Sequence, residues 1–139
     1  WFVVGRKDGK AQIWTLALDR IESIRYELSA TYSKKDFDGD SYYENTIGVT
    51  VLDDKSLAEV LLRIDRNNAP YVLTKPFHHS QELIKREKDG SILIKVRVHL
   101  NLEFERLIMG FGDSLEVESP KSFRHKIKRK LERAYQQYY

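Results

Sequence analysis

The stretch from residue 92 to residue 100 constrains the fold more than any other part of the sequence. Apolar side chains alternate there with mostly polar ones, and a single face would carry Ile92, Ile94, Val96, Val98 and Leu100. A period of two predicts a β-strand with one face against a core. Such a strand needs neighbouring strands and a covering layer, so the chain is expected to contain a sheet with one buried face.

The segments around this strand alternate between strand and helix patterns. Residues 47–51 and 58–64 are expected to form one strand, or two strands around a turn at Asp53-Asp54. Further strands are expected at residues 83–86 and 114–118, and helices at residues 67–73, 101–109 and from residue 119 onward. The order of strand, helix, strand, strand, helix, strand and trailing helix predicts an α+β, ferredoxin-like α/β layer.

Capping residues define the expected helix ends. Asn101 is expected to cap the helix of residues 101–109, and Gly110 to end it in the left-handed conformation. Ser119 is the expected N-cap of the last helix, with Pro120 at its first position. The apolar stripe of this helix, which should face a core, contains Phe123, Ile127, Leu131, Ala134, Tyr135 and Tyr138.

The N-terminal part shows a β-meander pattern. Strands are expected at residues 2–4 and 12–21, joined by a turn at residues 6–10, and a third strand passes through Ile24 and Tyr26. Three strands are too few to close a barrel, so strands upstream of Trp1 or strands of another chain are expected to complete it.

Polar residues separate the two patterns. We assign residues 1–30 to a partial barrel, residues 31–45 to a linker and residues 46–139 to a second domain. With 139 residues, of which 41% are hydrophobic and 32% charged, the chain suits one or two small domains. The absence of an apolar run long enough to span a bilayer, together with zero cysteines, predicts a cytoplasmic protein.

The net charge of the chain is +3, but acidic and basic residues are concentrated in different segments. Residues 36–60 hold seven acids and one lysine, whereas residues 120–139 hold seven basic residues and one acid. Arg124, Lys128 and Arg129 form a candidate basic surface for nucleic acid, and the alternative is a solvated helix face.

No catalytic motif, phosphate-binding glycine loop or dinucleotide fingerprint occurs, so the chain is not expected to be an enzyme and no cofactor is expected. His78 and His79 are adjacent, and on a strand they would point to opposite faces. We therefore expect no metal site.

Five short strings in a fixed order carry a family resemblance. They are Trp-Phe-Val at residues 1–3, Leu-Asp-Arg-Ile at 18–21, Asn-Thr-Ile-Gly at 45–48, His-His-Ser-Gln at 78–81, and Met-Gly-Phe-Gly at 109–112 followed by Glu-Val-Glu-Ser-Pro at 116–120. The chain resembles the WYL-domain family of bacterial regulators with its C-terminal WCX extension. Phe2 and Val3 replace the tyrosine and leucine of the family motif, and Ala17 stands where an arginine is usual.

The resemblance implies a transcription regulator. An N-terminal winged helix-turn-helix, outside this sequence, would bind DNA. A WYL barrel of the Sm or SH3 type would sense a ligand, often single-stranded nucleic acid, and the WCX extension would help to form a homodimer and transmit the signal. In this chain the barrel is partial and the extension is essentially complete.

The candidate ligand site combines aromatic faces for bases with cations for phosphates. Its residues are Trp1, Phe2, Arg6, Trp14 and Arg20. In the alternative interpretation the aromatic side chains fill the barrel and Arg20 pairs with a neighbouring acid. With the family set aside, the two interpretations are evenly balanced for Arg20.

In the second domain, His78, Ser80 and Gln81 are expected to hydrogen-bond main chain in the loop after Pro76. Two functions follow from the sequence as a whole. The chain is either the ligand-sensing and dimerising part of a transcription regulator or a purely structural oligomerisation module.

Overall fold

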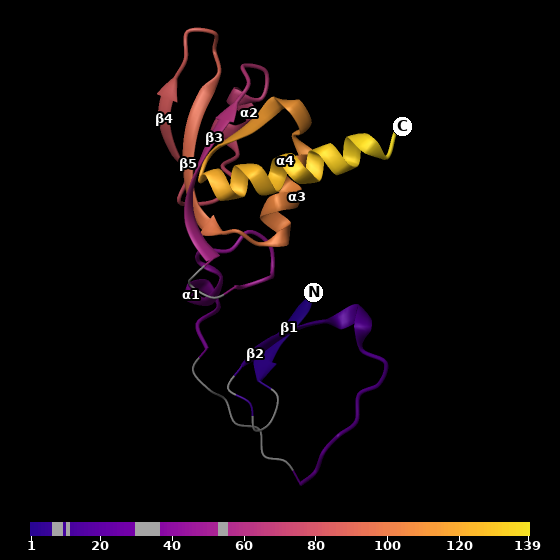
Figure 1. The fold of residues 1–139 in the computed structure, drawn as a ribbon. Helices are drawn as coiled ribbons and strands as arrows, with labels where there is room; N and C mark the ends of the chain where they lie inside the picture. The colour runs from indigo at the N-terminus through magenta and orange to yellow at the C-terminus, as the bar shows by residue number, and fades with distance from the viewer. Residues whose placement is uncertain (7–9, 11, 30–36, 53–55) are drawn as a thin grey trace. The chain divides into compact units, whose positions relative to one another are not determined.

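The computed structural model of the chain describes residues 1–6, 10, 12–29, 37–52 and 56–139. These residues divide into two units, residues 1–39 and residues 40–139 (Figure 1). The first unit contains a two-stranded sheet, and the second contains a four-stranded sheet with helices. The chain therefore belongs to the mixed α+β class.

The first unit is a β-hairpin followed by a short helical turn. β1 (Phe2–Arg6) pairs antiparallel with β2 (Ile13–Ala17), so that Phe2 lies opposite Ala17. The 3-10 helix η1 (Leu18–Arg20) comes next, and the Leu18 N–H donates to the Trp1 carbonyl oxygen at 3.0 Å. The second strand thus ends earlier than residue 21, where we expected it to end. The predicted turn lies mostly outside the described residues.

The predicted third strand through Ile24 and Tyr26 is wrong. Residues 21–27 have no regular secondary structure, and both side chains are almost fully exposed. An alternating segment becomes a strand only where a partner strand takes up its main-chain N–H and C=O groups. Within the described residues of this unit only β1 and β2 pair, so these residues form a two-stranded sheet and no closed barrel.

The polar stretch predicted as a linker contains a short helix. α1 (Gly39–Tyr43) lies within it, and the rings of Tyr42 and Tyr43 meet edge to face with centroids 4.9 Å apart. Residues 30–36 of the predicted linker lie outside the described residues.

The second unit has the predicted order of strands and helices. Its elements are β3 (Leu57–Ile64), α2 (Ala69–Thr74), β4 (Glu82–Arg86), β5 (Ile92–His99), α3 (Leu102–Gly110), the 3-10 helix η3 (Gly112–Ser114), β6 (Leu115–Ser119) and α4 (Lys121–Gln136). The strands form one antiparallel sheet in the order β4-β5-β3-β6. The long helix α4 runs across one face of this sheet (Figure 1).

The core lies between the sheet and its helices. The alternation predicted for β5 is confirmed, since Ile92, Ile94, Val96 and Val98 are completely buried. Side chains of β3 and β6 continue this apolar face, and α2, α3 and α4 cover it. The rings of Phe104 on α3 and Phe123 on α4 stack with centroids 5.5 Å apart.

Three local predictions for this unit are wrong. Residues 47–51 form bends and irregular chain rather than a strand. Gly110 is the last residue of α3 and has no positive φ, and Gly112 takes the left-handed conformation with a φ of +58°. Ser119 belongs to β6, because pairing with Leu61 of β3 extends that strand, so Pro120 becomes the N-cap of α4.

Only the first half of the α4 stripe meets the core. Phe123 and Ile127 are buried, whereas the side chains of Leu131, Tyr135 and Tyr138 are 41%, 64% and 87% exposed. The sequence pattern continues along the whole helix, but the core ends after its second turn. The distal part of the stripe, which continues past the end of α4 at Gln136 to Tyr138, is therefore an exposed apolar and aromatic surface, on which the rings of Tyr135 and Tyr139 lie with centroids 4.9 Å apart.

A buried carboxylate ties α3 to α4. Glu105 is 3% exposed, and its two oxygens lie 2.5 Å from Nζ of Lys126 and 2.5 Å from Nζ of Lys130. Burial by itself raises the pKa of Glu105, but the hydrogen bonds and charges of the two lysines outweigh it, and the pKa lies below its ordinary value. Two cations of the basic helix are thus used in a structural contact.

We expect Glu105→Gln to lower the free energy of unfolding by about 3 kcal/mol at neutral pH, because it leaves two lysines without their buried partner. Since the pKa is lower in the folded than in the unfolded state, this stabilisation is lost as the pH falls through the folded-state pKa. Urea unfolding at several pH values should show the difference from wild type shrinking on acidification. Glu132→Gln, which removes an exposed pair with Lys128, is the matched control. A difference that does not vary with pH would contradict this assignment.

Candidate functional site

The candidate ligand residues of the first unit do not converge on one face of the hairpin. Opposed residues of an antiparallel pair point to the same side, and alternate residues of a strand share a face. Phe2 and Arg6 therefore lie on one face, and Trp14, which is opposite Gly5, lies on the other.

Phe2 and Trp14 are about half exposed, and Trp1 is almost fully exposed. Arg20 ends η1 and is also exposed. Among the described residues Arg20 forms no ion pair.

In the second unit, the loop between α2 and β4 is organised by Gln81 and Ser80. Gln81 Oε1 accepts from the Phe77 N–H at 3.0 Å, and its Nε2 donates to the Val72 carbonyl at 2.9 Å. Ser80 Oγ donates to the Arg97 carbonyl at 3.1 Å and accepts from the Arg97 N–H at 2.9 Å. The loop is thereby joined to α2 on one side and to β5 on the other.

His78 and His79 hold a single main-chain oxygen together. Nε2 of each ring lies 2.7 Å from the Glu44 carbonyl oxygen, and the ring centroids are 4.1 Å apart. The expectation that these rings point to opposite faces is wrong, because both residues lie in a turn ahead of β4 rather than in a strand. The two imidazoles therefore act on the same group.

Hydrogen bonding defines the tautomer of His78. Its Nε2 must donate, since a carbonyl oxygen only accepts, and its Nδ1 lies 2.8 Å from Ser80 Oγ and 3.2 Å from the Ser80 N–H nitrogen. Burial is the main cause that lowers the pKa of His78, and the neighbouring His79 lowers it further. The hydrogen bond to the Glu44 carbonyl and the Glu44 charge act in the opposite direction. His78 is therefore neutral at neutral pH.

Residues 44–50, which we call the anchored segment, are held along their whole length. The His99 N–H donates to the Asn45 carbonyl at 2.8 Å. Asn101 Nδ2 donates to the carbonyls of Ile47 and Thr50, both at 2.9 Å. Side chains and main chain of the sheet and of α3 thus satisfy groups that a strand partner would otherwise satisfy, which explains why residues 47–51 are not a strand.

Asn101 caps α3 as well as holding the anchored segment, and Glu103 holds the same segment through Thr50. Asn101 Oδ1 accepts from the Phe104 N–H at 2.9 Å, which confirms the predicted N-cap of α3. Glu103 Oε1 accepts from Thr50 Oγ1 at 2.7 Å and from the Thr50 N–H at 3.2 Å. Burial alone raises the pKa of Glu103, but these hydrogen bonds outweigh it and the pKa lies below its ordinary value.

Gly48 permits the close approach of Glu103. Its φ is +83°, and a Cβ atom there would lie 2.6 Å from Cγ of Glu103. The sequence analysis did not single out Glu103 or the second role of Asn101. An Asn-Thr-Ile-Gly string and an Asn-x-Glu at a helix start are each weak signals, and only the fold brings them together.

The candidate basic surface on α4 is partly neutralised. Arg124 pairs with Glu116 and donates to the Val117 carbonyl at 2.6 Å, and Lys128 lies 3.6 Å from Glu132. Arg129 is exposed and forms no ion pair among the described residues. The basic run in the sequence therefore overstates the positive charge available to a ligand.

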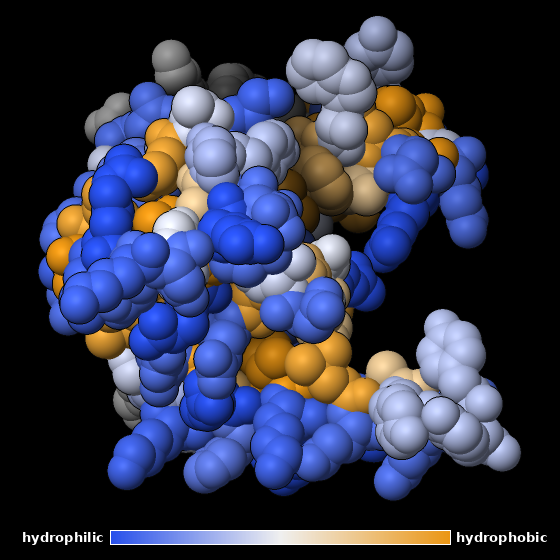
Figure 2. Space-filling view, turned by 90° about the horizontal axis from the view of Figure 1, so that it is seen from above, coloured by the Kyte–Doolittle hydropathy of each residue, from blue (hydrophilic) through white to orange (hydrophobic). Residues whose placement is uncertain are grey.

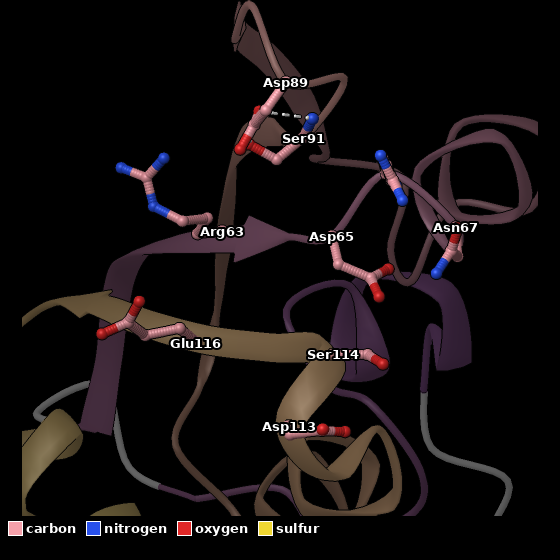
Figure 3. A pocket seen from close by; sticks show the side chains of 9 residues that line it. Arg63, Asp65, Asn67, Asp89, Ser91, Asp113, Ser114 and Glu116 are labelled. Atoms are coloured by element: carbon pink, nitrogen blue, oxygen red, sulfur yellow. Dashed lines mark hydrogen bonds between the residues drawn. The ribbon is translucent and has the colours of Figure 1, made fainter.

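A polar cavity of about 380 Å³ opens where β3 ends and where β5 and β6 begin (Figure 3). Asp65 Oδ1 accepts from the Asn68 N–H at 2.8 Å, and Asp89 Oδ1 accepts from the Ser91 N–H at 2.9 Å. Hydrogen bonds from the side chain and main chain of Asn68 and of Ser91 lower the pKa of Asp65 and Asp89, respectively. These two acids stabilise the loops around the cavity.

Other site classes have no counterpart in the described part of the chain. It contains no cluster of three or more histidine, cysteine, aspartate or glutamate side chains suited to a metal ion. Nor does it contain a helix with the length and apolar character needed to cross a membrane. Hydrophilic residues occupy most of the face seen in Figure 2, and apolar residues form patches between them.

The second unit is therefore an α+β module in which side chains of the turn before β4 and of the start of α3 hold residues 44–50. Residues 56–135 match the family model of the WCX domain. This match covers more than half of the chain, and the chain belongs to the WCX domain family. WCX domains are associated with WYL-domain regulators, which makes the second unit a regulator-associated C-terminal module. No curated protein matches the chain significantly.

We expect Asn101→Ala to lower the free energy of unfolding by about 2 to 4 kcal/mol, since it removes an N-cap and leaves two carbonyls without their donor. Asn67→Ala is the matched control, because Asn67 is exposed and its side chain makes no hydrogen bond with the described residues. Its expected cost is below about 0.5 kcal/mol. Urea unfolding of both variants checks the difference. Equal, small losses would show that Asn101 does not hold the anchored segment.

Proposed function

We propose that the chain is the C-terminal part of a bacterial WYL-type transcription regulator that acts in the cytoplasm. Membership of the WCX family supports this proposal. In this proposal, residues 1–30 are the C-terminal part of a WYL barrel of the Sm or SH3 type. Strands β1 and β2 are two of the strands of that barrel. A helix-turn-helix domain outside residues 1–139 contacts DNA. The chain itself has no catalytic function and needs no cofactor.

The topology of the second unit supports the assignment of its sheet to the ferredoxin-like folds. The strand order β4-β5-β3-β6, the antiparallel pairing and the sequence order of strands and helices are those of a split β-α-β arrangement. In this assignment the helices cover one sheet face and the other face remains open.

The single observation that carries the proposal is the anchored segment. It precedes the WCX sheet in the chain, and His78, His79, Asn101 and Glu103 hold it to the loop before β4 and to the start of α3. The segment lies near the start of the second unit, and a segment held by several side chains transmits a displacement that a solvated linker would absorb. A change of state in the first unit would thus reach the WCX module through this segment.

The first unit is the better candidate for contact with a ligand. Phe2, Trp14, Arg6 and Arg20 are exposed there and provide aromatic faces and cations. On the sheet of the second unit, by contrast, three of the cations are already paired with acids. Lys95 lies 3.0 Å from Glu82, and Arg63 lies 2.7 Å from Glu118. We therefore propose that single-stranded nucleic acid or a small anion binds at the hairpin.

The test is fluorescence anisotropy of a short labelled single-stranded DNA over a salt series. We expect Arg20→Ala to weaken binding by about tenfold and to reduce the salt slope by about one, as loss of one phosphate contact would. Arg25→Ala is the matched control, an exposed arginine of the same unit outside the proposed site. Equal effects of both substitutions, or no binding at low salt, would contradict a nucleic-acid site at Arg20.

One observation favours a second function, that of a structural oligomerisation module. The distal stripe, formed by Leu131 and Tyr135 of α4 and by Tyr138 just after the helix, is exposed although its pattern is that of a buried helix face. Two copies that met at this stripe would form a homodimer, which the regulator proposal also contains. The functions differ in whether the first unit binds a ligand.

Leu131→Asp should shift the chain toward the monomer in sedimentation equilibrium, because it places a charge within the apolar stripe. Gln136→Asp, which adds the same charge on another side of α4, should leave the oligomeric state unchanged. The dimer interface would lie elsewhere if the two variants sedimented alike.

A further inference from the structure

Two hollows of opposite charge adjoin at the end of the sheet where β3 ends and β5 begins. The first is the polar cavity described above, whose lining contains four acids and two arginines (Figure 3). The second hollow, of about 620 Å³, lies along β4 and the turn after it, and its lining contains four cations and two acids. Arg63 and Asp89 line both hollows, so the acidic hollow and the basic hollow share a border.

The two linings together are electrically neutral, but their charges are separated. With the shared residues counted once, the cations are Arg63, Arg66, Lys85, Arg86 and Lys88, and the acids are Asp65, Glu87, Asp89, Asp113 and Glu116. A field of this kind attracts a molecule with one positive and one negative end more strongly than a molecule with a single charge. The charge pattern therefore indicates a dipolar ligand.

Part of this charge is already used within the protein. The ion pairs are Arg63–Glu118, Lys85–Glu87 and Arg124–Glu116. In contrast, Arg66, Arg86 and Lys88 form no ion pair in the described part of the chain, and the same holds for Asp113. These four side chains are exposed, and their charges are available to a ligand.

Asp65 and Asp89 add acceptors to the acidic hollow. Their hydrogen bonds to turn residues hold the pKa of both carboxyl groups below the ordinary value, so both are ionised at neutral pH. An ionised carboxylate offers about four acceptor positions, and the bonds within each turn leave some of them for a ligand donor.

The loops around the hollows are fixed by contacts of the protein itself. The Asp65 N–H donates to the Ser114 carbonyl at 3.0 Å, which joins the end of β3 to the start of β6. The Gly90 N–H donates to the Glu87 carbonyl at 3.1 Å and closes the turn before β5. A Cβ atom at Gly90 would lie 3.1 Å from Cβ of Arg66, so this turn packs against the Arg66 stem. A preformed site costs little ordering when a ligand binds.

We propose that the two hollows together bind a small zwitterion, a molecule of amino-acid size with one amino group and one carboxylate. Its ammonium group lies at Asp113 in the acidic hollow, and its carboxylate lies at Arg86 and Lys88 in the basic hollow. Volumes of about 380 Å³ and about 620 Å³ are in the range of small-molecule sites. The site goes beyond the proposed function, since it lies in the second unit and depends on neither the hairpin nor DNA.

The experiment is a titration followed by amide NMR spectra of the whole chain. The probes are glycine, γ-aminobutyrate and ε-aminocaproate, in which the chain between the amino group and the carboxylate lengthens. Butylamine and pentanoate, which each replace one charged end of γ-aminobutyrate by a methyl group, are the single-charge controls. The amides of Arg66, Gly90 and Ser114 report on the hollows, and the amide of Arg20 reports on the hairpin.

We expect the longer zwitterions to shift the three reporter amides of the hollows and not that of Arg20. They should bind at least about tenfold more tightly than either single-charge control, because each control loses one charge-assisted contact. Glycine should also bind more weakly, since its two charges are too close together to reach both hollows.

Two variants assign the ends of the ligand. Asp113→Asn should weaken binding of γ-aminobutyrate about tenfold and leave pentanoate unchanged, whereas Arg86→Gln should weaken it as much and leave butylamine unchanged. Both side chains are exposed, so the fold should tolerate these changes, which the amide spectrum of each variant checks. The matched controls are Asp19→Asn and Arg106→Gln, which change exposed residues outside the hollows.

Three results would overturn the site. One is equal binding of the longer zwitterions and of either glycine or the single-charge controls. Another is the absence of shifts at Arg66, Gly90 and Ser114. The third is wild-type affinity in both Asp113→Asn and Arg86→Gln. Arg20→Ala, which tests the hairpin, should leave zwitterion binding unchanged, so the two proposals can fail separately.

Discussion

The apolar face shared by β3 and β5 is the constraint on which the second unit depends. These strands pair along their whole length, from Leu57 opposite His99 to Ile64 opposite Ile92, and their inward side chains are completely buried except that of Ala58, which is partly buried. A sheet with one such face must be covered on that side only. Helices α2, α3 and α4 cover it, and the connections between the elements remain at the rim, where they form the polar contacts of the candidate site.

The anchored segment is held by such polar contacts. Its carbonyl and N–H groups face no partner strand, and side chains from the loop before β4 and from the start of α3 satisfy them instead. Residues that are far apart in the sequence therefore contact the same segment. A small rearrangement of any of these residues changes how firmly the segment is held.

Much of the fold could be predicted from local pattern, and much of the site could not. The alternation of β5 and the N-cap at Asn101 depend on neighbouring residues alone, and both predictions are confirmed. The strand through Ile24 is wrong because a ladder partner is a property of the whole fold. The convergence of His78 and His79 was missed because their geometry depends on a turn, and Glu103 was missed because its partners lie more than fifty residues away.

The sequence by itself determined the class of the chain, since hydrophobic period, capping residues and motif order are local and additive signals. It did not determine which apolar positions would be buried. Along α4, Phe123 and Leu131 belong to the same apolar stripe, yet only Phe123 is buried, because the core ends between them. Nor did it determine which cations are free, since Lys126 and Lys130 are paired by Glu105 from another helix. Only the tertiary structure decided these points, because burial and pairing depend on groups brought together from distant parts of the chain.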